Sequence, residues 1–330
     1  MDISIIVCNY NNEKYLKQCI DSLLNQSFKG KYEIIVIDDC STDSSCQILH
    51  DYYNDEAKLR INVLSENVGI SVARNSGIDL ALGRYICFVD SDDFVESHYL
   101  QKLFNSISKD ESIGLVQCNF QAVTSEGEFI KIEETPPSLY SVYVKPLYQL
   151  FERKITALVW DKIYIKSIID SNHIRFLNGV KNEDLDFNAK YATQISNVVF
   201  IDDSLVSYRQ NPDSTTKKPN LKLILDMFTV CQSILDCSKY DSSNDPRYSV
   251  SFAIMYLYFA IVIGIKRIMQ TEDRVFSKLR MLKKLYDTHK NFCCKNKIEL
   301  KFKALASDAI SFKQKILCIP FVIYPWNINA

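Results

Sequence analysis

Tyr85-Ile-Cys-Phe-Val-Asp-Ser-Asp-Asp93 joins a short apolar run to an acidic cluster. The run has the length and composition of a strand that is buried on both faces of a sheet. The cluster, Asp90 to Asp93, follows it without a spacer. In open α/β sheets, ligands bind beyond the carboxyl ends of the strands. This stretch therefore predicts a central strand with a functional polar edge.

The same arrangement of apolar run and polar turn occurs twice upstream. Ile3 to Val7 precedes Asn9 to Asn12, and Glu33 to Ile37 precedes Asp38 to Asp43. Apolar residues at helical spacing separate the first two runs, namely Tyr15, Leu16, Cys19, Ile20, Leu23 and Leu24. Strands that alternate with helices predict an α/β fold with a mostly parallel central sheet flanked by helices. We expect the three polar clusters to face one crevice at the carboxyl edge of that sheet.

The pattern beyond Asp93 is less regular. It predicts a strand over 115–121, a mainly helical segment over 148–169, a helix over 182–191 and a strand over 198–208. The polar stretch 209–219 contains two prolines and predicts a domain boundary. We therefore predict one domain over 1–215 and a mainly helical C-terminal region over 216–330.

Composition limits the partners and the compartment. The net charge of -1 gives no reason to expect nucleic-acid binding by the chain. The odd count of 11 cysteines, without a CxxC pair, favours a reducing, cytoplasmic location over a disulfide framework. The first residues have no basic region or cleavage site and predict a strand, not a signal peptide.

Two C-terminal features leave membrane contact open. Tyr248 to Ile265 is free of charge and is interpreted as a core helix, a membrane-interface helix or a membrane span. Between 266 and 303 there are 12 Lys and Arg against 4 Asp and Glu. This basic stretch and the aromatic tail 313–326 predict either peripheral contact with an anionic membrane at its inner face, or a solvated helix face with a docking tail. The oligomeric state is left open.

The acidic cluster has two interpretations of its own. Asp90 and Asp92 offer hard oxygen ligands of the kind that Mg²⁺ and Mn²⁺ prefer beside phosphates. Alternatively, the cluster is an ordinary solvated turn or helix cap. Asp38 and Asp39 at a neighbouring strand end would repel it unless a cation or a donor-rich ligand lies between them. Arg74 is then a phosphate ligand or a structural counter-ion.

Four blocks in order carry a resemblance to a known family. They are Ser4-Ile-Ile-Val-Cys-Asn-Tyr-Asn-Asn12, Val36-Ile-Asp-Asp-Cys-Ser-Thr-Asp43, Asn67-Val-Gly-Ile-Ser-Val-Ala-Arg-Asn-Ser-Gly77 and Phe88-Val-Asp-Ser-Asp-Asp93. These blocks resemble those of family 2 glycosyltransferases, inverting enzymes of the GT-A fold, of the kind that builds bacterial surface polysaccharides. Val159-Trp-Asp-Lys-Ile-Tyr164 and Asn182-Glu-Asp-Leu-Asp-Phe187 resemble two later blocks. The resemblance implies a nucleotide-sugar half over 1–110 and an acceptor half over 111–215.

The resemblance also implies donor-side roles. Asp39 would bind the uracil or ribose side of the nucleotide, and the backbone of Cys8, Asn9 and Tyr10 would form the other wall. Asn67 and Arg74 would contact the nucleotide or the diphosphate. The residues that would form the DxD element and hold the divalent cation, Mn²⁺ or Mg²⁺, are Asp90, Ser91 and Asp92, with Asp92 the more direct ligand and Asp90 the second.

On the acceptor side, the resemblance implies that Asp184 is the general base, with Glu183 or Asp186 as alternatives. Charge at a helix N-terminus is the structural interpretation of the same acids. Trp160, Lys162 and Glu183 would belong to the acceptor side of the site wall, although Trp160 is also interpreted as a core residue.

The resemblance implies a hexosyltransferase or N-acetylhexosaminyltransferase that uses a UDP-sugar donor and a saccharide acceptor, which we expect to be lipid-linked. Two departures stand out. Cys8 occupies a position where the family often has proline, and 209–214 lacks the family's frequent histidine, leaving Tyr208, Arg209 and Ser214 to close over the diphosphate. The competing hypotheses are a sugar nucleotidyltransferase and a non-catalytic nucleotide-sugar-binding module.

Overall fold

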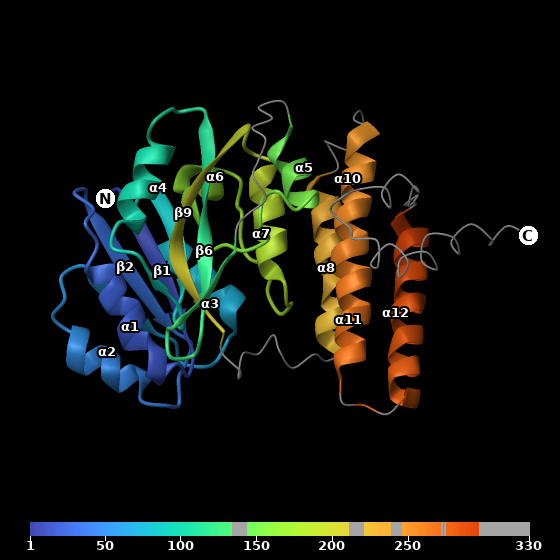
Figure 1. Cartoon of the computed structure of the whole chain (residues 1–330), viewed down its shortest axis with the longest axis horizontal. Helices are drawn as coiled ribbons and strands as arrows, with labels where there is room; N and C mark the ends of the chain where they lie inside the picture. The colour runs from blue at the N-terminus through green and yellow to red at the C-terminus, as the bar shows by residue number, and fades with distance from the viewer. Residues whose placement is uncertain (134–143, 211–220, 239–245, 272, 274, 297–330) are drawn as a thin grey trace, which may run out of the picture. The chain divides into compact units, whose positions relative to one another are not determined.

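The computed structural model of the chain describes residues 1–133, 144–210, 221–238, 246–271, 273 and 275–296. Its sheet begins with parallel strands in the order β3-β2-β1-β4. These strands are β1 (Ile3–Asn9), β2 (Tyr32–Asp38), β3 (Leu59–Val63) and β4 (Tyr85–Asp90). Strands β1 and β2 of this part lie side by side in Figure 1. The predicted alternation of strands and helices is therefore confirmed for this part of the chain.

Three helices connect these strands: α1 (Glu13–Leu24), α2 (Ser45–Tyr53) and α3 (Ile70–Leu80). The buried face of α1 consists of residues from the predicted helical repeat, namely Tyr15, Leu16, Cys19, Ile20 and Leu23. Helix α3 lies close to β1, where a Cβ atom on Gly77 would be only 2.4 Å from Cγ2 of Ile6. A glycine at this position lets the backbone of α3 approach the sheet.

The second half of the sheet is mixed. It continues from β4 through β8 (Lys162–Ile165), β6 (Ile113–Val123) and β9 (Asn197–Arg209) to β5 (Phe94–Val95). Strand β8 runs antiparallel to β4 and β6, whereas β6 and β9 are parallel. Strand β7 (Phe129–Glu133) pairs with β6, and the helices α4 (Tyr99–Ile107) and α6 (Lys166–Ser171) complete this part. The mostly parallel character holds for the first half only.

The prediction of a mainly helical segment over 148–169 was wrong in its centre. Only α5 (Pro146–Phe151) and the start of α6 are helical there, and β8 lies between them. Lys162 of β8 pairs with Gln117 of β6, and Cys87 of β4 pairs with Ile163. This four-residue segment forms a strand because it pairs with β4 on one side and β6 on the other. So short an apolar run has no periodicity that would predict a strand from the sequence.

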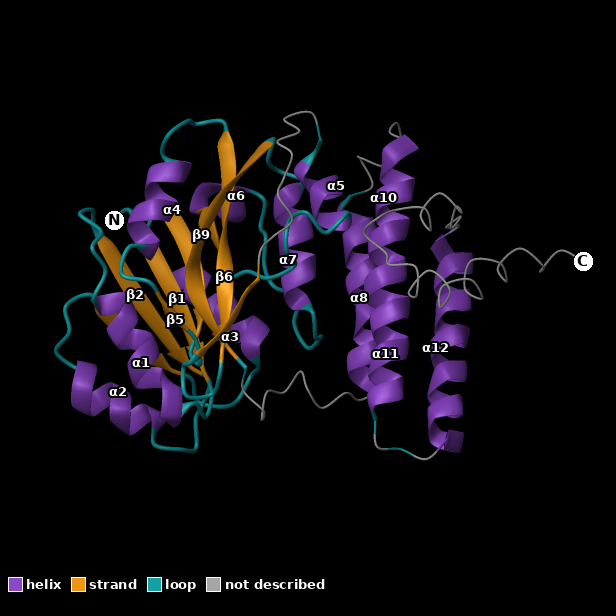
Figure 2. Cartoon of the chain, viewed as in Figure 1, coloured by secondary structure: helices purple, strands orange, loops and turns teal. Residues whose placement is uncertain are grey.

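The described residues divide into two compact units. The first comprises 1–146, 157–179 and 191–212, and the second comprises 147–156, 180–190 and 213–330. The described part of the second unit is helical (Figure 2). Its helices, besides α5 and most of α7 (Glu183–Ala192), are α8 (Leu221–Cys237), α10 (Pro246–Tyr256), the π-helix η2 (Leu257–Val262), α11 (Ile263–Gln270) and α12 (Val275–Asn296).

These units are interleaved along the chain, whereas the predicted domains are contiguous. The second unit takes 147–156 and 180–190 from the segment predicted as the acceptor half. The boundary predicted after residue 215 lies outside the described residues, as do Ser214 and the tail 313–326. The division into 1–215 and 216–330 stays a prediction.

One continuous helical stretch of the described chain, Arg247–Gln270, is long and apolar enough to cross a membrane. In the structure, 72% of its most apolar 18-residue segment is buried. Tyr248, Phe252 and Tyr256 stack along it, and Tyr256 also stacks on Phe292 of α12 at 5.2 Å. This packing supports the core-helix interpretation of Tyr248 to Ile265.

Candidate active site

The three predicted polar clusters meet at one edge of the sheet. Asn9 at the end of β1 pairs with Asp38 of β2, and Cys8 pairs with Asp90 of β4. Side chains join the turns beyond these strands. Nδ2 of Asn9 donates to Oδ2 of Asp38 at 2.7 Å, and Nδ2 of Asn12 donates to Oγ of Ser91 at 2.8 Å. The strand ends therefore form one connected polar surface, as the pattern of the sequence predicts.

Asp38 supports this surface from inside. Its side chain is buried and accepts hydrogen bonds from the backbone N–H and the hydroxyl of Ser41, at 2.8 and 2.7 Å. With the amide of Asn9, these donors compensate the cost of burying a carboxylate. Asp38 thus shapes the turn after β2.

Asp39 connects the β2 turn to the start of helix α3. Its two carboxylate oxygens accept the backbone N–H groups of Val68 and Gly69, both at 2.8 Å. Gly69 has φ +87, a left-handed conformation that favours glycine. Nδ2 of Asn67 donates to the backbone carbonyl of Asp39 at 3.3 Å. These contacts order the loop that carries Asn67, and the nucleotide contacts predicted for Asp39 and Asn67 stay predictions.

The remaining wall residues differ in what they expose. Cys8 is buried, and burial raises the pKa of its thiol to about 12, so the side chain is neutral at physiological pH. The phenol ring of Tyr10 is exposed. Contact of Cys8 with a nucleotide would therefore use its backbone, as predicted, whereas Tyr10 presents its side chain.

Arg74 of α3 is buried and faces the acidic cluster. Its Nη2 donates to Oδ1 of Asp90 at 3.0 Å, and its guanidinium lies over the ring of Phe176 at 5.2 Å. The side-chain amide of Asn75 accepts the backbone N–H of Phe176 at Oδ1, at 2.8 Å, and donates from Nδ2 to the backbone carbonyl of Phe176, at 3.0 Å. The counter-ion role of Arg74 is thereby seen directly, and its contact with a phosphate stays a prediction.

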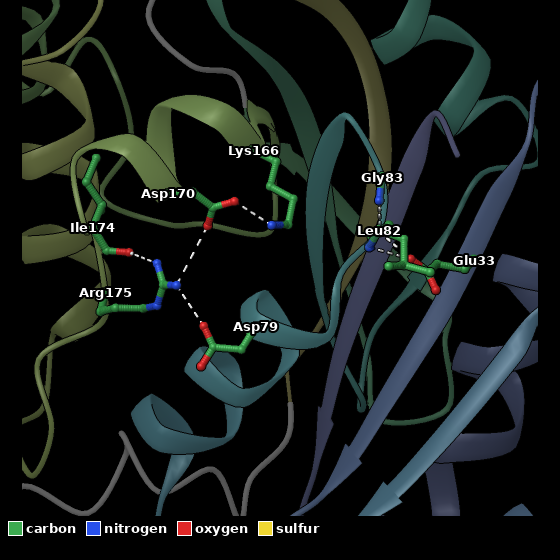
Figure 3. A network of polar contacts seen from close by, with 9 residues as sticks. Glu33, Asp79, Leu82, Gly83, Lys166, Asp170, Ile174 and Arg175 are labelled. Atoms are coloured by element: carbon green, nitrogen blue, oxygen red, sulfur yellow. Dashed lines mark hydrogen bonds and ion pairs between the residues drawn. The ribbon is translucent and has the colours of Figure 1, made fainter.

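A second arginine secures the segment that carries Phe176. Arg175 binds Asp79 of α3 at 2.7 Å, lies 3.7 Å from Asp170 of α6 and donates to the carbonyl of Ile174 (Figure 3). Residues about 100 positions away in the chain are thus tied to the helix of Arg74. Because Asp79 is largely exposed, this ion pair adds little to the stability of the fold, and its main effect is to position the segment that carries Phe176.

Within the acidic cluster, two carboxylates reach solvent and two side chains do not. Asp90 and Asp92 are partly exposed, whereas Ser91 and Asp93 are buried. Asp93 accepts the backbone N–H of Arg209 at 2.7 Å. Burial, with Asp92 and Asp90 nearby, holds the pKa of Asp93 well above its usual range. The accessible carboxylates are therefore the two that were predicted to hold a cation.

Arg209, at the end of β9, fixes the backbone of this acidic turn through hydrogen bonds, and we call this set of contacts the clamp. Nε donates to the backbone carbonyl of Asp92 at 2.8 Å, Nη1 to that of Ser125 at 2.7 Å, and Nη2 to Oε1 of Gln18 at 2.7 Å. The guanidinium also lies over the ring of Tyr15 at 4.5 Å. We expected Arg209 to close over the diphosphate. In the structure it is buried, and its guanidinium donates to acceptors within the protein.

Replacing Arg209 by Lys is expected to destabilise the first unit by about 2 kcal/mol, because one ammonium cannot reach acceptors on three sides and leaves partly buried carbonyl groups without their donor. Chemical denaturation of the full chain measures this loss. The exposed Arg84→Lys is the matched control and should unfold like the parent. Equal stability of Arg209→Lys and Arg84→Lys would contradict the clamp.

The residues present fit a divalent cation in a limited way. Among the described residues, no group of three or more His, Cys, Asp and Glu side chains is arranged to hold a metal ion. Asp90 and Asp92 nevertheless supply two partly exposed carboxylates, two residues apart at a strand end. Mg²⁺ is commonly held by one or two carboxylates together with substrate phosphates and water. The donor set therefore suits a cation that arrives with a phosphorylated substrate.

Comparison with known proteins identifies the family. The family model described as "Glycosyl transferase family 2" matches residues 4–178, more than half of the chain. The chain belongs to glycosyl transferase family 2. The match includes all three strand-end clusters and ends six residues before Asp184.

Proteins named as glycosyltransferases match this chain over part of their length. It is 34% identical to the glycosyltransferase EpsJ of Bacillus subtilis over 225 residues, which cover 66% of this chain and 63% of EpsJ. It is 31% identical over 211 residues to the poly(ribitol-phosphate) beta-N-acetylglucosaminyltransferase TarS of Staphylococcus aureus, covering 63% of this chain and 35% of TarS. The matched region thus spans less than two thirds of these relatives.

Solved structures of glycosyltransferases support the GT-A fold for this chain. The crystal structure of S. aureus TarS 1–349 with UDP-GlcNAc superposes with a TM-score of 0.70 at 20% identity, covering 93% of this chain and 83% of that one. A mannosyltransferase of Pyrobaculum calidifontis, solved with GDP-Man and Mn²⁺, gives a TM-score of 0.56 at 14% identity, covering 99% and 87%. At these identities the likeness concerns the fold alone.

Two residues predicted on the acceptor wall of this family 2 chain lie in its core. Lys162 is fully buried, and its Nζ donates to Oδ1 of Asp161 and to the carbonyl of Leu158, both at 2.6 Å. Trp160 is 3% exposed and stacks on Tyr208 at 5.2 Å. The wall assignment of Lys162 is therefore wrong, and Trp160 follows its core interpretation, since other side chains already cover both.

The acidic segment lies in the first turn of α7, in the second unit. Glu183 and Asp186 are buried, and Asp186 is paired with Lys190 at 2.6 Å. Asp184 is partly exposed, and its backbone carbonyl accepts Nδ2 of Asn188 at 2.9 Å. Of the three acids, Asp184 is the one whose side chain keeps access to solvent. Its role as base stays a prediction.

Several residues that build the site have no local signal in the sequence. Phe176 and Arg209 act through contacts to Arg74 and Asp92, about 100 positions away. A phenylalanine in a loop or an arginine at a strand end has many uses, so residue type alone does not reveal these roles. A sequence signal for this arrangement would be two arginines, one before and one after an acidic turn in the chain, such as Arg74 and Arg209 here.

Proposed function

We propose that this chain is an inverting glycosyltransferase that moves a sugar from a UDP-sugar to a saccharide acceptor and forms a β-glycosidic bond. The observation that carries the proposal is the pair of partly exposed carboxylates, Asp90 and Asp92, at the edge where β1, β2 and β4 end. Arg74 donates to the side chain of Asp90, and Arg209 donates to the backbone carbonyl of Asp92. Such a preorganised edge suits the charge that develops on a leaving diphosphate.

The donor side follows from the same edge. Asp92 and Asp90 would hold Mn²⁺ or Mg²⁺, which when bound supplies positive charge beside the diphosphate. Arg74 adds a fixed positive charge next to Asp90. The nucleotide would lie along the backbone of Cys8 and Asn9, with the Tyr10 ring exposed beside it. Asp39 and the loop of Asn67 would form the opposite wall.

We assign the acceptor side to Asp184. Its carboxylate accepts the proton of an acceptor hydroxyl, whose oxygen attacks the anomeric carbon as the bond from that carbon to the diphosphate oxygen breaks. Attack on the face opposite the leaving group inverts the anomeric carbon, so that an α-linked donor gives a β-linked product. UDP leaves with the bonding electrons. Support comes from the position of Asp184 in the segment 182–187, which resembles the family's acidic block, and from its partial exposure.

The names of relatives support a class of substrate. TarS is named for transfer of N-acetylglucosamine to poly(ribitol-phosphate) and has been solved with UDP-GlcNAc. A related enzyme is named as a poly(ribitol-phosphate) beta-glucosyltransferase. We therefore propose a hexosyl or N-acetylhexosaminyl donor and an acceptor in surface polysaccharide synthesis, lipid-linked at the cytoplasmic face of the membrane.

Release of UDP from a panel of UDP-sugars, with and without Mn²⁺, tests this proposal. We expect one donor to be hydrolysed slowly in the presence of Mn²⁺ and EDTA to abolish the release. Binding of UDP-sugars without any release would favour a non-catalytic module. Release of pyrophosphate from a nucleoside triphosphate and a sugar phosphate would favour a nucleotidyltransferase. Either outcome would overturn the assignment.

A further inference from the structure

The turn between α11 and α12 exposes a group of large apolar side chains. Met269 at the end of α11 is 58% exposed, and on α12 Val275, Phe276 and Leu279 are 70%, 85% and 55% exposed. Nζ of Lys278 donates to the carbonyl of Met269 at 3.0 Å, which brings the two helix ends together. We call these four side chains the apolar tip. Exposed apolar groups of this kind mark interaction sites.

The two helices that carry the apolar tip also carry exposed basic side chains. Lys266 of α11 and, on α12, Arg280, Lys283 and Lys284 are exposed. Arg280 and Lys283 follow Phe276 and Leu279 by four positions, so they lie on the same face of the helix. Over its whole length α12 carries six Lys and Arg against one acid, Asp287. Asp273 is an exposed acid in the turn itself.

This combination points to one partner. A second copy of the chain would place two positive surfaces against each other, because a two-fold interface brings the same patch together from both subunits. Nucleic acid would satisfy the charge but not a nearly fully exposed phenylalanine and its aliphatic neighbours. An anionic bilayer satisfies both, since apolar and aromatic side chains enter the boundary of headgroups and acyl chains while Lys and Arg contact the anionic headgroups.

We propose that the apolar tip inserts into the interfacial region of an anionic lipid bilayer, and that Lys266, Arg280, Lys283 and Lys284 bind its headgroups. The proposal concerns the surface of the second unit alone and does not depend on the sugar-transfer reaction. The sequence suggested membrane contact by the basic stretch 266–303 as a whole. We now assign the contact to these named side chains, and not to the largely buried helix Arg247–Gln270.

Flotation of the full chain with vesicles tests the proposal. We expect binding to phosphatidylglycerol vesicles, at least tenfold weaker binding to phosphatidylcholine vesicles, and release by high salt. Arg280→Gln with Lys283→Gln should weaken partitioning about 25-fold, at about fivefold for each lost charge. Phe276→Ser with Leu279→Ser should weaken it at least tenfold.

Matched controls on the first unit make the result specific. Phe129→Ser with Ile132→Ser removes two other exposed apolar side chains, 62% and 50% exposed, and Lys29→Gln with Lys31→Gln removes exposed charges. Both controls should float like the parent, and all variants should release UDP from donor at the parental rate. Absent flotation, equal binding to both lipids, or tip variants that bind like the parent would overturn the proposal. So would sedimentation showing that the tip variants convert an oligomer into monomers.

Discussion

Replacing Asp92 by Asn is expected to lower the rate of sugar transfer about a thousandfold. A cation beside the leaving group contributes several kcal/mol to the transition state, and each 1.36 kcal/mol corresponds to about a factor of ten. Asp92 is partly exposed, so the substitution leaves no buried charge unpaired. The backbone clamp from Arg209 to the Asp92 carbonyl does not involve the changed side chain. The fold should therefore be kept while the rate falls.

UDP release at saturating donor, measured over a series of Mn²⁺ concentrations, checks this expectation. Asp51→Asn is the control, since Asp51 is an exposed carboxylate that lies 3.2 Å from Nδ1 of the neighbouring His50. Asp90→Asn should also slow release and, in addition, free Arg74 from its ion pair. If Asp92→Asn keeps the parental rate and the parental response to Mn²⁺, the cation site lies elsewhere.

Replacing Asp184 by Asn is expected to slow transfer by about 10³, within the range of about 10² to 10⁴ that a positioned general base contributes. The amide keeps the shape of the carboxylate but cannot accept the proton of the acceptor hydroxyl. Donor affinity should stay unchanged, because the proposed role of Asp184 concerns the acceptor alone. A selective loss of turnover is thus the expected signature.

Comparison with Glu183→Gln separates the alternatives for the base. Glu183 is buried in the same turn, so its substitution should affect stability more than turnover. Donor binding by calorimetry and UDP release from the same preparations measure both quantities. A Glu183→Gln variant that folds normally yet loses turnover, beside an active Asp184→Asn, would transfer the assignment to Glu183.

The two arginines show how the acidic edge tolerates its own charge. Asp90, Asp92 and Asp93 follow one another within four residues, and their mutual repulsion contributes to the raised pKa of Asp93. Arg74 compensates the negative charge of Asp90 through a side-chain ion pair. Arg209 binds the cluster through the backbone carbonyl of Asp92. The geometry of the edge therefore depends on residues from α3 and β9 together.

The sequence by itself determined the first half of the fold and the place of the site. Apolar runs followed directly by polar turns, separated by helical repeats, allow few arrangements other than parallel strands whose carboxyl ends share an edge. The pairing of Asn9 with Asp38 and of Cys8 with Asp90 follows from that arrangement. These signals are local and periodic, so they are visible without a structure.

Only the tertiary structure decided which candidate side chains are accessible. Lys162 and Arg209 are polar residues near the predicted site, yet both are buried among protein acceptors. The strand β8 exists because β4 and β6 pair with it from both sides. Burial and strand pairing depend on contacts between residues far apart in the chain, whose free energies no local pattern records. The sequence therefore identifies the acids of the edge, and the packing around them determines which ones are exposed.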